Sequence, residues 1–425
     1  MLTVEENERL TRVGPGTPAG ELLRRYWQPV ATYDEIEDRW TTRVRVLGED
    51  LVLYRDRSGG LGLITERCPH RSASLYYGIP TEDGLRCAYH GWCFNKKGEC
   101  TEQPNEREGS KMKEKVEAKS YPVKEMGGLI FAYMGPGEPP VLPQFDAYVV
   151  EGGVRTIGRG VINCNWLQVM ENSVDPVHTQ WLHGRFYEFL HEDKKVKTAI
   201  ARHQKKIAFD EFEFGIIKRR LFEGQSEDAD DWKVGHPLLF PNGLAVGSGG
   251  GFFTQYTLQL RVPIDDTHTR HYWYHTYVPP EGIDVPAHLL EKPAVFDTPI
   301  RGDDGEYLTE YVHVQDIMMW ETQGAITDRT VENLGASDLG VITYRRMLKR
   351  EIEKVEKGED PIGTLRDPGR EQLIALPRER HKNNHSEGFA NYLRRHMMSF
   401  SPIAEDLIRL FEANDETRHD KVDAD

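Results

Sequence analysis

The chain has 425 residues, and its 54 basic against 69 acidic side chains give a formal net charge of −15. This length allows two domains of roughly 100–200 residues each, and the acidic balance argues against nucleic acid and anionic membranes as main partners. The N-terminus lacks the basic and apolar regions of a signal peptide, and no apolar run reaches the ~18 residues of a membrane span. We therefore expect a cytoplasmic protein.

Residues 1–30 predict a short helical lead-in, because ENERLTRV and AGELLRRYW flank a Gly-Pro turn. Residues 31–145 predict a first domain built mostly of short strands. Its clearest signal is TTRVRVLGEDLVLYRD, which alternates apolar and polar residues around a Gly-Glu-Asp turn, as a β-hairpin does. The Gly- and Pro-rich run from Gly135 to Pro143 marks the boundary of this domain.

Residues 146–412 predict a second, α+β domain. NWLQVMENSVDPVHTQWLHG has helix-like spacing, whereas FTQYTLQLRVPIDDTHTRHYWYHTYVP alternates across a turn at Asp265–Asp266. YRRMLKREIEKVEKG and NYLRRHMMSFSPIAEDLIRLFEA predict C-terminal helices. Residues 413–425 form a charged tail.

Two Cys/His pairs indicate a metal site in the first domain: Cys68-x-His70 and, after a 16-residue spacer, Cys87-x2-His90. Two thiolates and two imidazoles are able to bind zinc, but zinc sites usually combine like pairs. Mixed pairs suit a binuclear iron–sulfur cluster with two thiolates on one iron and two imidazoles on the other. In a reducing compartment, clustered cysteines bind metal more often than they form disulfides, so we expect reduced thiols at Cys93 and Cys100.

A second pattern, Asp175-x2-His178-x4-His183, lies in the second domain. In its structural interpretation, Asp175 caps a helix that ends at Gly184. On an ideal helix the two histidines would lie roughly 140° apart. A shared metal ion therefore requires a bulge or a helix end between them, a feature often found at functional sites.

CPH…CAYHGWCF resembles the cluster motif of the Rieske non-haem iron aromatic-ring-hydroxylating oxygenases, including Tyr89 and Gly91-Trp92. The Asp-x2-His-x4-His pattern resembles the catalytic iron motif of the same family. The resemblance implies an all-β Rieske [2Fe–2S] domain followed by an α+β helix-grip catalytic domain. It also implies one [2Fe–2S] cluster and one Fe²⁺ per subunit, O₂ as co-substrate, and NADH used only through a flavin/iron–sulfur reductase, with or without a ferredoxin.

The resemblance also implies roles for single residues. The cluster ligands are Cys68, His70, Cys87 and His90, and the iron ligands are His178, His183 and Asp316, with Glu321 and His313 as alternatives to Asp316. Asp175 resembles a bridging aspartate that hydrogen-bonds His178 and the cluster ligand His90 of a neighbouring subunit, which implies a homotrimer. Asn172 is a further candidate.

Nearly the whole chain resembles the phthalate dioxygenase branch of this family, whose members hydroxylate rings or demethylate methoxy-aromatic acids. We expect oxidation of an aromatic carboxylate, by O-demethylation of a lignin-derived, biphenyl-type methoxy acid with release of formaldehyde. Ring cis-dihydroxylation of a phthalate-type acid is the alternative, and a non-catalytic electron carrier or a zinc-stabilised binding protein are alternatives of another class. Arginine pairs bidentately with carboxylates, and Arg185 and Arg202, which follow the iron motif, are the candidates.

Overall fold

The computed structural model describes residues 1–249, 254–279, 281–380, 393 and 396–410, so the tail predicted at 413–425 lies outside the described residues. The lead-in is helical as predicted, with α1 (Val4–Thr11) and α2 (Pro18–Arg24). It ends earlier than residue 30, because Gln28 already begins strand β1 (Gln28–Thr32).

The N-terminal part of the chain forms three small sheets. One holds β2 (Thr41–Val46), β3 (Glu49–Arg55), β4 (Leu61–Thr65) and β9 (Ser120–Tyr121). The second holds β5 (Ile79–Pro80), β6 (Gly84–Arg86), β7 (Cys93–Asn95) and β8 (Cys100–Glu102). The third holds β1, β11 (Leu129–Ala132) and β10 (Val123–Met126).

The predicted hairpin is present as β2 and β3, but its turn comes earlier than the Gly-Glu-Asp sequence suggested. Val46 pairs with Glu49, so the two turn residues are Leu47 and Gly48. Both have positive φ, 49° and 76°, which is the backbone of the type I′ turn that matches strand twist. Their N–H groups donate to the carbonyls of Pro263 and Ile264, so the turn ties the first domain to the second.

The second part of the chain is built on one large, mainly antiparallel sheet. In spatial order its strands are β13 (Gln204–Phe212), β14 (Gly215–Phe222), β15 (His236–Leu239), β16 (Gly243–Gly249), β17 (Thr254–Asp265), β18 (His268–Val278), β12 (Val154–Ile162) and β19 (Ala294–Asp297), with β20 (Glu379–Arg380) beside β16. The predicted turn between β17 and β18 is confirmed, because the first strand ends at Asp265 and the second begins at His268.

Helices surround this sheet. They are α4 (Asp146–Val149), α5 (Trp166–Ser173), the π-helix η3 (Thr179–Phe186), α6 (Tyr187–Leu190), α7 (Asp230–Lys233), α8 (His288–Glu291), α9 (Val312–Thr322) and α10 (Leu339–Glu356), whereas α3 (Asp34–Glu37) packs on the small sheets of the first domain. The C-terminal helix predicted in YRRMLKREIEKVEKG is thus confirmed as α10. Of the segment predicted after it, residues 404–410 are helical. No helix of the described residues is long and apolar enough to cross a membrane.

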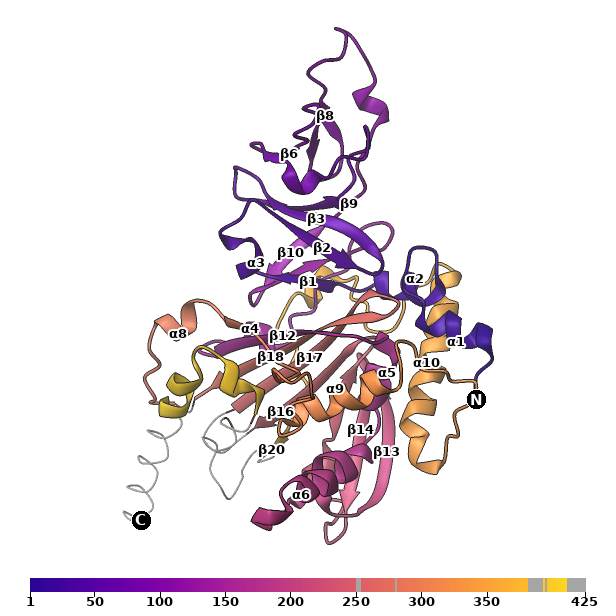
Figure 1. Ribbon diagram of the computed structural model, residues 1–425, viewed down its shortest axis with the longest axis vertical. Coiled ribbons are helices and arrows are strands. Elements are labelled where there is room, and N and C mark those ends of the chain that lie inside the picture. The colour runs from indigo at the N-terminus through magenta and orange to yellow at the C-terminus, as the bar shows by residue number, and fades with distance from the viewer. Residues whose placement is uncertain (250–253, 280, 381–392, 394–395, 411–425) are drawn as a thin grey trace.

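The large sheet is buried on both faces. Tyr272 and Tyr274 of β18 belong to the core that includes α2 and α10, whereas Trp273 and Tyr277 pack with Ile317 of α9 in a second core. Figure 1 shows α9 lying across the sheet, as a helix-grip fold requires. It also shows β6 in the upper part of the molecule and α9 and α6 in the lower part, so the elements that carry the two sets of predicted ligands lie in separate parts of one chain.

Candidate functional site

Two loops of matching geometry carry the first set of predicted ligands. In each loop the cysteine carbonyl accepts a hydrogen bond from the N–H four residues later, Ser72 to Cys68 at 2.8 Å and Gly91 to Cys87 at 3.0 Å. Ser72 and Gly91 have φ values of 57° and 76°, and this left-handed backbone closes each loop tightly. Two similar loops therefore present a Cys/His pair each.

The four side chains of these loops suit a cluster with mixed ligands. The thiols of Cys68 and Cys87 are buried, and the rings of His70 and His90 lie 4.6 Å apart between centroids. Trp92 stacks on His70 at 4.3 Å and fixes its orientation. Burial raises the pKa of the Cys68 thiol to about 11, so this sulfur is a thiolate at neutral pH only beside a cation such as iron.

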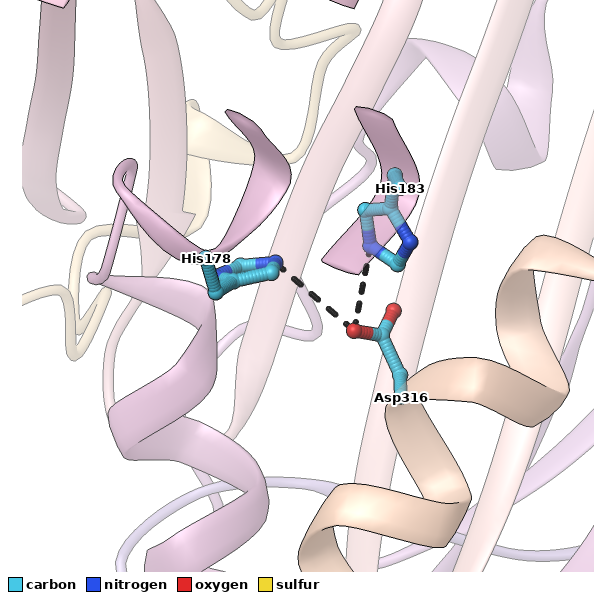
Figure 2. A group of neighbouring side chains, drawn as sticks. All are labelled: His178, His183 and Asp316. Atoms are coloured by element: carbon cyan, nitrogen blue, oxygen red, sulfur yellow. Dashed lines mark ion pairs between the residues drawn. The ribbon is translucent and has the colours of Figure 1, made fainter. Parts of the chain in front are cut away.

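The second set of predicted ligands also comes together (Figure 2). His178 Nε2 lies 3.6 Å and His183 Nε2 lies 3.1 Å from Asp316 Oδ1, and one ligand atom of each residue lies within 4.8 Å of the others. Bonds of about 2.1 Å at right angles around a metal ion place ligand atoms about 3 Å apart. Two imidazoles and a carboxylate at this spacing fit Fe²⁺ with open positions for other ligands.

The helical irregularity that the histidine spacing requires is a π-helix. The segment Thr179–Phe186 makes i→i+5 hydrogen bonds, so residues five apart lie about one turn apart. The rings of His178 and His183 consequently face each other edge to face at 5.2 Å. The expectation that Gly184 ends the helix is wrong, because the π-helix continues to Phe186. A Cβ at Gly184 would lie 2.7 Å from the Cα of Ala201. Gly184 thus allows close packing.

His183 is held by a residue that sequence analysis missed. Its Nδ1 lies 3.0 Å from Gln315 Oε1, and the Gln315 amide donates to the carbonyl of Thr309 at 2.8 Å. The amide oxygen must therefore accept, which leaves the proton on Nδ1 and directs the lone pair of Nε2 toward Asp316. In the sequence, the only feature that could have indicated a role for Gln315 is its position directly before Asp316.

Asp316 is partly buried and ionised. Burial opposes its ionisation, but His183, His178 and the Asn172 amide outweigh burial and lower the pKa of Asp316 to about 2. Asn172 Nδ2 donates to Asp316 Oδ1 at 3.3 Å. The candidate Asn172 therefore contacts the carboxylate of the predicted iron ligand directly.

Asp175 uses its two oxygens differently. Oδ1 accepts from the N–H groups of Val177 at 2.7 Å and His178 at 3.4 Å, as a helix cap does. Oδ2 lies 3.6 Å from His178 Nδ1. The side chain therefore caps the helix and also faces the ring of a predicted iron ligand.

Glu321 and His313 are the two alternatives to Asp316 as the third ligand. Neither makes a described contact with His178 or His183. Glu321 is engaged elsewhere, since it accepts from the Asn163 N–H at 2.8 Å and from Tyr307 at 2.7 Å and pairs with Arg301 at 3.1 Å. His313 lies one helical turn before Asp316 on α9 and is buried. Asp316 is the residue that meets both rings.

The two arginines predicted to bind a substrate carboxylate are exposed. Arg185 pairs with Glu188 at 3.3 Å, and Arg202 donates to the carbonyl of Ala199. Neither makes a described contact with the three iron-site residues, and their role stays a prediction.

A buried arginine that the sequence did not single out is Arg261, on β17. It is 1% exposed, donates to Gln259, and among the described residues has no carboxylate within 4.0 Å. The other buried arginines of the described chain all have one: Arg24 with Glu49, Arg220 with Asp231, and Arg329 and Arg345 with Glu171. Burial lowers the pKa of Arg261 to about 9, against the opposing field of Asp316, so the guanidinium stays charged at neutral pH.

A further group of possible metal ligands consists of Asp231, His236 and Glu379. His236 Nε2 lies 2.6 Å from Glu379, and Asp231 pairs with Arg220 at 3.0 Å. A guanidinium beside the site competes with a cation for the carboxylate. We therefore interpret this group as an ion-pair network.

Comparison with known proteins identifies the family. Residues 26–122 match the model of the Rieske [2Fe-2S] domain, and residues 303–375 match the model described as LigXa C-terminal domain like. The chain is 43% identical to the 5,5'-dehydrodivanillate O-demethylase oxygenase subunit of Sphingobium sp. strain SYK-6, over 89% of this chain and 87% of that protein. This chain belongs to the Rieske non-haem iron oxygenases.

Other relatives agree with this assignment. This Rieske oxygenase is 32% identical to the phthalate 4,5-dioxygenase oxygenase subunit of Pseudomonas putida, over 86% of this chain and 89% of that protein. The solved terminal oxygenase of carbazole 1,9a-dioxygenase from Novosphingobium sp. KA1 has the same fold, with a TM-score of 0.59 at 20% identity over 80% of this chain and 93% of that one. The predictions of fold class and of a Rieske cluster plus a mononuclear iron are confirmed, and the zinc-protein and electron-carrier alternatives are wrong.

Proposed function

We propose that this Rieske oxygenase demethylates a methoxy-substituted aromatic acid and releases formaldehyde. The observation that carries the proposal is Arg261, a buried cation without a carboxylate partner in the described chain, within the field of Asp316. A buried, unpaired charge is costly, and a substrate carboxylate would offset that cost. The 43% identity to a protein named as an O-demethylase oxygenase subunit supports the reaction type.

The residues define what each part of the site contributes. His178, His183 and Asp316 would hold iron from one side, and iron so held supplies the binding and reduction of O₂. Gln315 keeps the proton of His183 on Nδ1. The balanced reaction is aryl–OCH₃ + O₂ + 2 e⁻ + 2 H⁺ → aryl–OH + HCHO + H₂O, with electrons from NADH through a reductase.

We further propose that the chain works as a homotrimer. The elements that carry its two sets of proposed metal ligands lie in separate parts of the molecule (Figure 1), and an exposed aromatic residue lies next to each set in the sequence. Tyr89, next to His90, is 59% exposed, and Trp181, between the iron-site histidines, is 63% exposed. Exposed aromatic residues are common at protein interfaces. Contact between the two sites of neighbouring chains would cover both and bring Asp175 to the partner subunit's His90.

The reductase type and the cytoplasmic location stay predictions. A reductase with flavin and iron–sulfur groups, with or without a ferredoxin, would supply the electrons. Sedimentation of the purified protein would test the trimer, since a monomer at micromolar concentration would contradict it.

The experiment that tests the reaction is a substrate screen. Purified holoprotein, an NADH-dependent reductase and O₂ would be supplied with methoxy-aromatic acids and with phthalates. We expect one formaldehyde per NADH from a methoxy acid. Ring cis-dihydroxylation is the second candidate, favoured by the 32% identity to a phthalate 4,5-dioxygenase subunit. A cis-diol formed from a phthalate without formaldehyde from any methoxy acid would overturn the demethylation proposal.

Replacing Arg261 with glutamine should weaken binding of the acid. A hydrogen bond to a charged group is worth about 1.5–3 kcal/mol, so KM for a methoxybenzoate should rise about 10–100-fold, while KM for the matching benzamide changes little. Arg45→Gln, at an exposed position of β2, is the matched control and should leave both constants unchanged. Equal effects of Arg261→Gln on acid and amide would contradict a carboxylate-binding role.

Replacing His90 with cysteine should lower the reduction potential of the cluster. A thiolate adds negative charge to an iron that imidazole leaves neutral, and the potential should fall by on the order of 100 mV or more. Redox titration followed by electron paramagnetic resonance measures the change. His288→Cys, on the exposed surface of α8, is the control. Wild-type protein containing zinc and no acid-labile sulfide would contradict the ligand assignment itself.

A further inference from the structure

The face of β17 and β18 that lies under α9 is polar, although it is buried. The register pairs Gln255 with Tyr277, Thr257 with His275, Gln259 with Trp273 and Arg261 with His271. Directly paired residues lie on the same face of the sheet. Trp273 and Tyr277 pack with α9, so the other members of these pairs point to the same side. A face enclosed by a helix is normally apolar, and this one is not.

Two histidines on this face and on α9 stand out. His271 is 0% and His313 is 5% exposed, and both rings lie edge to face against Trp273, at 4.0 Å and 5.6 Å between centroids. Both nitrogens of each ring are buried without a hydrogen-bond partner among the residues that the structure describes. Buried polar atoms are rarely left in this state, because each one destabilises the folded protein. A cluster of such atoms points to a bound partner that completes it.

Both imidazoles are neutral at neutral pH. Burial lowers the pKa of His271 and of His313 well below the usual value, and for His271 the charge of Arg261 acts in the same direction. A neutral imidazole offers one N–H donor and one lone-pair acceptor. The two rings together therefore present two donors and two acceptors.

The donor and acceptor pattern selects among the substituents of an aromatic acid. A carboxylate and a methoxy oxygen only accept hydrogen bonds, so each would leave the imidazole acceptors unmet. A phenolic hydroxyl both donates and accepts. His313 lies one helical turn from Asp316, on the same side of α9, and His271 lies opposite Arg261 on the neighbouring strand. One histidine thus neighbours the proposed iron ligand on α9, the other neighbours the proposed carboxylate partner on the sheet, and both contact Trp273.

We propose that His271 and His313 bind a phenolic hydroxyl of the substrate, which makes the enzyme selective for hydroxylated methoxy-aromatic acids. This inference rests on the proposed function, since it assumes an aromatic acid at the iron site. A site built to hydrogen-bond a hydroxyl rejects an analogue that lacks it, because its own polar atoms are then left unpaired.

Isothermal titration calorimetry on the holoprotein tests the proposal without turnover. The probes are 4-hydroxy-3-methoxybenzoate and 3,4-dimethoxybenzoate, which differ by one methyl group on the oxygen. We expect wild-type protein to bind the hydroxylated acid at least about tenfold more tightly. His271→Leu and His313→Leu should reduce this ratio to near one. His313→Gln should restore part of it, because an amide also donates and accepts.

The experiment includes a surface variant as a control and a check on folding. His288→Leu, at an exposed position of α8, should keep the wild-type ratio. Leucine removes unpartnered polar atoms from the interior, so the leucine variants should melt no lower than wild type. If they do unfold, His313→Gln alone decides, and loss of all selectivity in a folded glutamine variant would contradict a role that depends on one donor and one acceptor.

The outcomes separate the two proposals. Wild-type protein that binds both acids equally, or leucine variants that keep the tenfold preference, would overturn the histidine proposal and leave demethylation standing. Wild-type protein that binds neither acid and forms no formaldehyde from any methoxy acid would overturn the proposed function as well.

Discussion

Replacing Asp316 with alanine should abolish turnover and release the mononuclear iron, while the visible spectrum of the iron–sulfur cluster stays unchanged. Loss of residues that merely support metal ligands costs 10–100-fold, so loss of the carboxylate itself should cost at least about 100-fold. The cluster should be unaffected because its predicted ligands lie on separate loops of the first domain. Iron and acid-labile sulfide counts, run beside the activity assay, measure both effects.

The matched control for this variant is Glu321→Ala, on the same helix. Glu321 contacts Asn163, Tyr307 and Arg301, so its loss should lower the melting temperature but leave iron bound. Full iron occupancy in Asp316→Ala together with iron loss in Glu321→Ala would reverse the assignment.

The parts of the site that could be predicted from the sequence are local. Cys68, His70, Cys87 and His90 lie on two short loops, and the spacing within each loop determines which side chains meet. An irregular helix between His178 and His183 could also be predicted, because no regular α-helix places residues five apart on one side. In both cases a few consecutive residues determine the geometry.

The parts that escaped prediction depend on tertiary contacts. Alternation in β17 and β18 normally indicates one buried face and one face in solvent, and the polar residues then belong to the solvent face. Here α9 covers that face, so Arg261 and His271 are buried. The position of α9 across the sheet follows from packing between segments that are distant in sequence.

Asp175→Asn should reduce turnover by at least about 100-fold while most of the iron stays bound. Asparagine is about as good a helix cap as aspartate, so its oxygen can still accept from the Val177 and His178 N–H groups. It lacks the charge that faces His178 Nδ1, 3.6 Å away, and that would also face the partner subunit's His90. Stability should therefore be unchanged while coupling between the two sites is lost.

A single-turnover assay with pre-reduced protein, run beside an iron count and a melting curve, separates these roles. Asp175→Ala is the companion variant, since it removes the cap as well and should also lose about 1 kcal/mol of stability. If Asp175 is only a cap, asparagine should support near-normal oxidation of the reduced cluster by O₂ and substrate. That result would refute the bridging role, because the charge would then be dispensable for electron transfer between subunits.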